Sequence, residues 1–205
     1  MQWYLEDIQR LERKPVVQSD RPKVVFYGSS TFTRWGEVLE QCFPQIEAVN
    51  LGFGGSTLAA CAWFFDRVVP RQQPYYLFVY AGDNDLGDGR NPEEVVLFFE
   101  QLLACVKTAL GDIPVCFVSI KPSLARQHLR GNIEYANQCI RQRIARRGGP
   151  LYYLDLYRHM IDERGWPQPA LFDADGLHLS PLGYALWQRE IGAQLEAMLP
   201  KNESI

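Results

Sequence analysis

Five short apolar runs, separated by helix-length segments, constrain most strongly what this chain can fold into. The runs cover residues 24–27, 46–51, 75–80, 114–120 and 151–155. Four of them are apolar over most of their length, which is typical of strands buried on both faces of a parallel sheet. Strands that alternate with helices through short connections form right-handed βαβ units. The sequence therefore predicts an α/β fold of the three-layer α/β/α sandwich type.

The segments between the runs have the patterns of helices. Helices are predicted over residues 34–42, 57–69, 92–110, 132–147 and 180–199. The helix over 92–110 carries the clearest start signal, because Asn91 is a good N-cap and Pro92 suits the first helical position. The first 13 residues repeat apolar side chains at helical spacing (Tyr4, Ile8 and Leu11). They predict a helix that docks on the domain's own surface, with a dimer contact as the alternative.

Length and composition indicate one globular domain over residues 1–205, with residues 1–20 as an N-terminal helix and linker docked on it. The hydrophobic fraction is 47% and the net charge is −3, so charge gives no reason to expect nucleic acid or an anionic membrane as a partner. No run reaches 18 apolar residues, which excludes a membrane span. The first ten residues contain no apolar leader, and we expect a cytoplasmic protein.

The five cysteines are odd in number and show no Cys-x-x-Cys spacing, so reduced thiols are favoured over disulfides or a zinc site. They are Cys42, Cys61, Cys105, Cys116 and Cys139.

Three short polar motifs carry the candidate chemistry. Gly28-Ser29-Ser30-Thr31 and Gly82-Asp83-Asn84-Asp85 each follow an apolar run, and Asp175-Gly176-Leu177-His178 lies near the C-terminus. In open α/β sheets, ligands bind beyond the carboxyl ends of the strands. A serine, an amide side chain and an Asp/His pair are the groups that serine-based acyl transfer uses. Together the motifs indicate a hydrolase.

Each motif alone also has a simpler interpretation. The first fits a turn with a capping hydroxyl. The glycine-rich loop over 50–57 suggests a dinucleotide site, but that fingerprint needs glycine at Thr57 and follows the first strand of its fold. The acidic loop from Asp83 resembles a calcium loop, but Asp88 occupies the position that needs glycine. His128 and His159 fit structural or solvated positions, as do the arginines of the predicted helix over 132–147.

Taken jointly, the motifs resemble those of the SGNH hydrolases, also called the GDSL esterase/lipase family, over residues 22–198. The resemblance makes Ser30 the nucleophile, Asp175 and His178 the other members of the triad, and Gly55 and Asn84 partners of the Ser30 amide in the oxyanion hole. In the first block, Ser29 replaces the usual aspartate and Thr31 the usual leucine. The segment 120–126 also resembles one found in a bacterial subgroup of the family, which suggests for Arg126 no role beyond contact with substrate.

The family resemblance implies a flavodoxin-like, five-stranded parallel sheet and hydrolysis of esters, thioesters or acetylated sugars without metal or cofactor. Ser30 then attacks the acyl carbonyl, His178 takes its proton, and Asp175 orients the imidazole. The implied partner is a small-molecule ester, and the chain is expected to be a monomer or a weak homodimer. A non-catalytic ligand-binding domain on the same fold and an acyltransferase remain as alternatives.

Small acyl groups, from acetyl to butyryl, are the predicted substrates. The segment 120–131 is rich in charged and polar side chains and does not form the apolar flap that a lipid-binding lid needs. Phe32, Trp35 and Phe53 could wall a pocket or belong to the core. Hydrolysis of p-nitrophenyl esters of increasing length should be fastest at the short end. A rate that climbs from butyrate to palmitate would contradict the prediction.

Overall fold

A five-stranded, wholly parallel sheet forms the centre of the molecule in a computed structural model, which describes residues 1–199. The strand order is β2-β1-β3-β4-β5, so the chain reverses direction of winding between β2 and β3. The strands are β1 (Lys23–Gly28), β2 (Glu47–Gly52), β3 (Tyr76–Tyr80), β4 (Val115–Val118) and β5 (Leu151–Leu154). All five predicted strands and the α/β/α class are confirmed. The last six residues of the predicted domain, 200–205, lie outside the described part.

Successive strand residues face opposite helix layers, and both faces are buried. In β1, Val25 and Tyr27 pack into one hydrophobic cluster, whereas Val24 and Phe26 pack into the other. The same alternation continues in β3 and β4. This two-sided burial explains why the strands read as continuous apolar runs rather than as alternating patterns.

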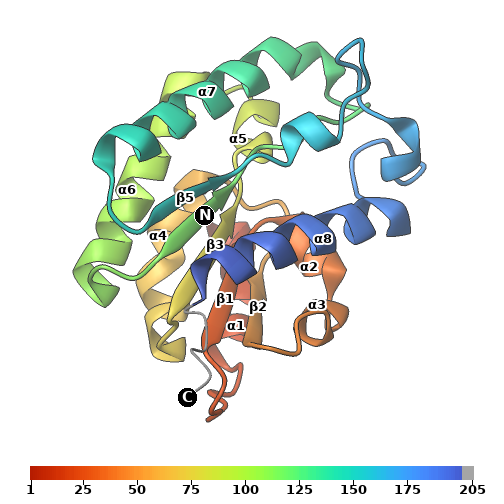
Figure 1. Cartoon of the computed structure of the whole chain (residues 1–205). Coiled ribbons are helices and arrows are strands. Elements are labelled where there is room, and N and C mark those ends of the chain that lie inside the picture. Colours follow the sequence, from red (N-terminus) through yellow and green to blue (C-terminus); the bar gives the residue numbers. More distant parts are fainter. Residues whose placement is uncertain (200–205) are drawn as a thin grey trace.

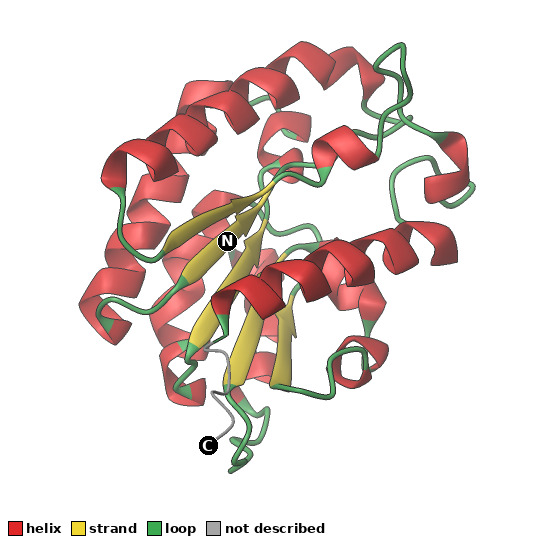
Figure 2. Ribbon diagram, viewed as in Figure 1, coloured by secondary structure: helices red, strands yellow, loops and turns green. Residues whose placement is uncertain are grey.

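Helices cover both faces of the sheet (Figures 1 and 2). One layer is built from α1 (Leu5–Glu12), α4 (Leu58–Val68), α6 (Pro92–Leu110) and α7 (Arg130–Arg147). The other contains α2 (Ser30–Trp35), α3 (Val38–Gln41) and α8 (Pro181–Met198). Short helical turns lie at η1 (Gln2–Tyr4), η2 (Pro70–Gln72), α5 (Asp83–Gly87), η3 (Gln127–Leu129), η4 (Tyr157–His159) and η5 (Pro169–Leu171).

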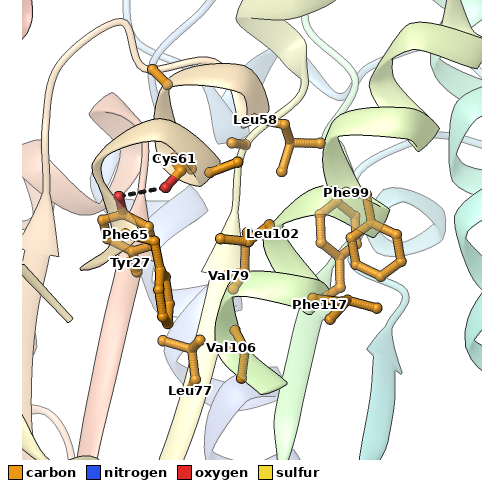
Figure 3. Packing of buried hydrophobic residues seen from close by; sticks show 14 of the residues in the cluster. Tyr27, Leu58, Cys61, Phe65, Leu77, Val79, Phe99, Leu102, Val106 and Phe117 are labelled. Atoms are coloured by element: carbon orange, nitrogen blue, oxygen red, sulfur yellow. Dashed lines mark hydrogen bonds between the residues drawn. The ribbon is translucent and has the colours of Figure 1, made fainter. Parts of the chain in front are cut away.

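Side chains from α4 and α6 interdigitate with those of β1, β3 and β4 in the larger cluster (Figure 3). Tyr27 is fully buried there, and its hydroxyl donates to the carbonyl of Cys61 at 2.8 Å. Burial raises the pKa of the Tyr27 phenol well above its ordinary value. A buried hydroxyl without a partner costs free energy, so this bond lets a polar side chain remain in an apolar layer.

Two segments differ from the predicted pattern. A single helix over 34–42 was wrong, because Gly36 adopts φ +63° and separates α2 from α3. The first of the two helices, α2, also begins earlier than predicted, at Ser30. The acidic stretch after Gly82 forms the short helix α5 instead of a loop. The predicted start of α6 is confirmed: Asn91 caps it, and Glu94 completes a reciprocal capping box.

The N-terminal helix packs along α4. Tyr4, Ile8 and Leu11 are 0–5% exposed and belong to the cluster that also contains α4 and α6. All five cysteines are free thiols, as predicted. Within residues 1–199, no helix is long and apolar enough to cross a membrane.

The carboxyl ends of three strands are tied together at Gly28. The carbonyl of Gly28 accepts from the Phe53 amide at 2.9 Å, and the Ser29 amide donates to the Tyr80 carbonyl at 2.9 Å. Gly28 has φ +147°, and a Cβ atom there would lie 1.9 Å from the Tyr80 carbonyl oxygen. Only glycine permits this approach of β1 to the end of β3.

Gly28→Ala is therefore expected to lower the free energy of unfolding by roughly 3 kcal/mol or more, through backbone clash and strain. Gly131→Ala is the matched control, because that glycine lies in α7 with nothing within 4 Å of an added Cβ. It should stabilise the protein by about 0.5–1 kcal/mol. Urea denaturation checks both values. Equal stability of Gly28→Ala and the wild type would contradict the account of this turn.

Candidate active site

Ser30 is the first residue of α2, directly beyond the end of β1. Its side chain is partly exposed, whereas that of Ser29 is fully buried and its Oγ has no partner. Ser29 is the N-cap of α2 but makes no capping hydrogen bond through its side chain. The interpretation of this motif as a turn with a capping hydroxyl therefore does not account for either serine. An amide at a helix start has no partner within its helix and can serve an anion.

The second block forms the end of β2 and the loop that follows. The Asn50 amide donates to the carbonyls of Phe32 and Gly36 at 2.8 and 3.1 Å, so this side chain fastens α2 to β2. Gly55 is exposed at the tip of the loop with φ +67°. Its carbonyl accepts from the Tyr4 hydroxyl at 2.9 Å, and that contact was not foreseen from the sequence. The N-terminal segment thus anchors the Gly55 peptide through its carbonyl oxygen.

Asn84 lies in the first turn of α5, beyond the end of β3, and is 9% exposed. Its Nδ2 donates to the carbonyl of Ser56 at 3.1 Å. This bond places the amide beside the residue that follows Gly55. Asn84 and the glycine-rich loop, which are separated by about thirty residues in sequence, are therefore joined directly.

Asp175 and His178 form a close pair on the loop before α8. The Asp175 Oδ2 and the His178 Nδ1 are 2.6 Å apart, and the other carboxylate oxygen accepts from the backbone amides of Leu177 and His178, each at 2.9 Å. These bonds, the His178 side chain first, hold the pKa of the Asp175 carboxyl well below its usual range. The carboxylate stays charged and leaves the Nε2 of the ring free to act.

Two contacts connect this loop and the helix α8 that follows it with the rest of the site. The Tyr184 hydroxyl of α8 donates at 2.9 Å to the carbonyl of Thr31, the residue after Ser30. The Gly176 carbonyl accepts from the Ala125 amide at 3.0 Å. No hydrogen bond within residues 1–199 joins the Ser30 hydroxyl to His178. The structure therefore pairs Asp175 with His178 and Asn84 with the glycine-rich loop, and places Ser30 beside the anchor of α8.

Other residues singled out in the sequence lie elsewhere. Phe32, Trp35 and Phe53 are 0–5% exposed in the two hydrophobic clusters, so the pocket-wall alternative was wrong and they are core residues. His159 is 3.6 Å from Glu190, in a surface pair, and His128 lies in η3. Within the described residues, no group of three or more His, Cys, Asp or Glu side chains is arranged to hold a metal ion.

Arg126 makes a contact that the sequence did not reveal. Its guanidinium donates to the Asn84 Oδ1 at 3.0 Å. The resemblance to a family segment had suggested contact with substrate, and no spacing in the sequence links residues 84 and 126.

Asp85, the residue after Asn84, bonds to the start of α4, where the glycine-rich loop over 50–57 ends. It is fully buried, and its Oδ2 accepts from the Leu58 amide at 2.7 Å, at the start of α4. Burial raises the pKa of the Asp85 carboxyl to about 6, although the amides of Leu58 and Ala59 and the charge of Arg90 oppose the shift. In the unfolded chain this carboxyl has its ordinary, lower pKa. The folded protein therefore binds the extra proton, and stability falls as pH rises through the interval between the two values.

Asp85→Asn should remove this penalty, because the amide still accepts from Leu58 and carries no charge. The difference in free energy of unfolding between variant and wild type should grow in favour of the variant by about 2 kcal/mol from pH 4.5 to 7. Urea denaturation at several pH values measures it. Asp88→Asn, at an exposed position just after α5, is the control and should show no such trend. A difference that does not change with pH would refute the prediction.

Comparison with known proteins agrees with this architecture. Among solved structures, a GDSL-like lipase from Bacteroides thetaiotaomicron has a TM-score of 0.77 at 18% identity, covering 97% of this chain and 98% of that one. A lipase/acylhydrolase from Enterococcus faecalis has a TM-score of 0.68 at 18% identity, covering 89% and 100%. A carbohydrate esterase family 3 protein from Talaromyces cellulolyticus has a TM-score of 0.67 at 18% identity, covering 86% and 97%. These likenesses show the SGNH hydrolase fold.

No curated protein matches this chain in sequence. The model of the GDSL-like Lipase/Acylhydrolase family, however, matches residues 18–186. Family and fold together support an esterase or acylhydrolase activity. The match spans most of the chain, which therefore belongs to the GDSL-like lipase/acylhydrolase family.

Proposed function

We propose that this protein is a serine esterase that cleaves small acyl esters through an acyl-enzyme. Ser30 attacks the acyl carbonyl, and the Nε2 of His178 takes the hydroxyl proton. Asp175 orients the ring and stabilises the imidazolium. Collapse of the tetrahedral intermediate expels the alcohol, which receives the proton from His178. Water activated by His178 then releases the acid and restores Ser30.

The observation that carries this proposal is the 2.6 Å pair between Asp175 and His178. The carboxylate accepts from Nδ1–H and so selects the tautomer in which Nε2 is a base. The next helix, α8, is anchored by Tyr184 to Thr31, the neighbour of the proposed nucleophile. A bond between nucleophile and base is often long until substrate binds, so its absence between Ser30 and His178 is compatible with catalysis.

The backbone amides of Ser30 and Gly55 and the Nδ2 of Asn84 are the proposed oxyanion donors. Two of the three lie at turns that follow strand ends, and the third is a side chain held by Ser56 and Arg126. Donors that are fixed before the reaction need not reorganise when charge develops on the carbonyl oxygen.

Short acyl groups remain the proposed substrates. The segment 120–131 is bonded to α5 through Arg126 and to the loop of Gly176 through Ala125. Because these contacts hold the segment against the protein, we do not expect it to act as a lid over a long acyl chain. One of the structural neighbours is named a carbohydrate esterase, so acetylated sugars belong in a substrate screen beside simple esters.

The alternative functions give different products. A non-catalytic binding domain would release no acid from any ester, and an acyltransferase would form a new ester when an alcohol is added. The paired carboxylate and imidazole favour catalysis, because a binding domain has no need for a base held in one tautomer. Product analysis with added alcohol separates hydrolysis from transfer.

A fluorophosphonate probe should label the wild type at Ser30, as read by peptide mass spectrometry. Ser30→Ala should abolish both labelling and ester hydrolysis, because the attacking oxygen is gone. Ser29→Ala is the matched control: that hydroxyl is buried and makes no hydrogen bond within the described residues, so labelling should persist. Label on Ser29, or label retained in Ser30→Ala, would refute the assignment.

A further inference from the structure

The side chain of Arg126 binds the first two residues of α5. One guanidinium nitrogen, Nη2, donates to the Asn84 Oδ1 at 3.0 Å. The other, Nη1, donates to the Asp83 carbonyl at 2.8 Å and lies 3.2 Å from the Asp83 carboxylate. The Arg126 side chain is 19% exposed, so these contacts are largely sheltered from water. A planar fork with several donors suits this simultaneous contact, and an ammonium group does not.

The Arg126 guanidinium and the Ser56 carbonyl together determine which way the Asn84 amide points. A guanidinium can only donate and a backbone carbonyl can only accept. With Arg126 on one side and the Ser56 carbonyl on the other, only one of the two amide orientations satisfies both partners. In that orientation, Nδ2 keeps one hydrogen on the Ser56 carbonyl and has a second hydrogen to offer.

Arg126 is itself held in place by its neighbours. A Cβ atom on Gly87 would lie 2.8 Å from the Arg126 Cζ, so the guanidinium lies where any side chain at position 87 would be. The Arg126 amide donates to the Ser123 Oγ at 3.2 Å, and the preceding residue, Ala125, binds the Gly176 carbonyl. The segment that carries Arg126 therefore bridges α5, which contains Asn84, and the loop of His178.

Removing Arg126 does not leave its charged neighbour alone. The Asp83 carboxylate is buried, and the Nζ of Lys121, which is also buried, lies 3.4 Å from it. The start of the same segment is clamped by Asn137, whose side chain exchanges two hydrogen bonds of 2.8 Å with the backbone of Ile120. The segment thus has anchors that do not depend on the guanidinium.

We propose that Arg126 is a positioning residue that fixes the orientation of the Asn84 amide, so that Nδ2 faces the reacting carbonyl oxygen. This inference rests on the proposed function of Asn84 as an oxyanion donor. Without the guanidinium, the Ser56 carbonyl alone restrains the amide, so the amide plane can swing and Nδ2 is no longer held toward the developing negative charge. Loss of Arg126 should therefore weaken stabilisation of the transition state more than it weakens substrate binding.

Steady-state kinetics with p-nitrophenyl acetate test the proposal. Arg126→Ala should lower kcat by about tenfold or more with little change in KM, up to the hundred- to thousandfold loss typical of deleting an oxyanion donor. Arg126→Lys should fall between wild type and Arg126→Ala, because one ammonium cannot reproduce the fork. Arg143→Ala, an exposed arginine of α7, is the control and should leave both constants unchanged.

A double-mutant cycle separates positioning from general damage. Once Asn84→Ala has removed the amide, Arg126→Ala should reduce kcat no further. Gly87→Ala offers an independent route, since its Cβ displaces the guanidinium without changing Arg126. It should lower kcat in the wild type but not in Arg126→Ala. Gly87→Ala and Arg126→Lys also supply the test if Arg126→Ala fails to fold.

Added guanidinium at millimolar concentration should restore part of the kcat of Arg126→Ala, and ammonium should not. The same rescue should fail in the Gly87→Ala/Arg126→Ala double variant, where the added methyl group fills the guanidinium position.

The outcomes distinguish the two claims. A wild type that neither hydrolyses esters nor reacts with the fluorophosphonate probe refutes the proposed function. An active wild type with full activity in Arg126→Ala refutes the positioning role alone. A rise in KM that persists in the Asn84→Ala background would also refute it, and would identify Arg126 as a substrate contact.

Discussion

The approach of β1 to the end of β3 is the constraint on which the rest of the structure depends. Gly28 has no side chain because the Tyr80 carbonyl occupies the space that a Cβ atom would need. The same turn bonds to Phe53 beyond β2, so three strand ends meet within one residue of Ser29. Ser30, the loop of Gly55 and the helix of Asn84 each begin at one of these ends. Their relative positions are thus determined by backbone contacts of the sheet before any side chain contributes.

A second group of contacts secures the polar side chains that face this edge. The Asn84 amide is held between Ser56 and Arg126, and the His178 ring is held by Asp175. The loops that carry Arg126 and His178 are in turn bonded to each other through Ala125 and Gly176. Asn84 is buried, and a buried polar group is stable only where its partners are complete. The Asp175 carboxylate is exposed and orients the His178 ring through a short hydrogen bond. Stability and the proposed chemistry therefore depend on the same bonds.

The strands were predictable because burial on both faces forces a continuous apolar run, and the start of α6 was predictable because its cap is local. The break at Gly36 was not predictable, since the amphipathic pattern continues across this residue although its positive φ ends the helix. The bond between Asp175 and His178 follows from a spacing of three residues. The contacts of Arg126 with Asn84 and of Tyr4 with Gly55 join segments 42 and 51 residues apart. Only the fold brings such pairs together, so no local pattern could have predicted them.

The most direct test of the central claim is a crystal structure of the protein after reaction with a small organophosphonate. Phosphorus should be bonded to the Ser30 Oγ. The phosphoryl oxygen should lie within about 3.2 Å of the amide nitrogens of Ser30 and Gly55 and of the Asn84 Nδ2, with the Asn84 Oδ1 still on Arg126. An adduct on another residue, or a phosphoryl oxygen directed away from these three donors, would contradict the account.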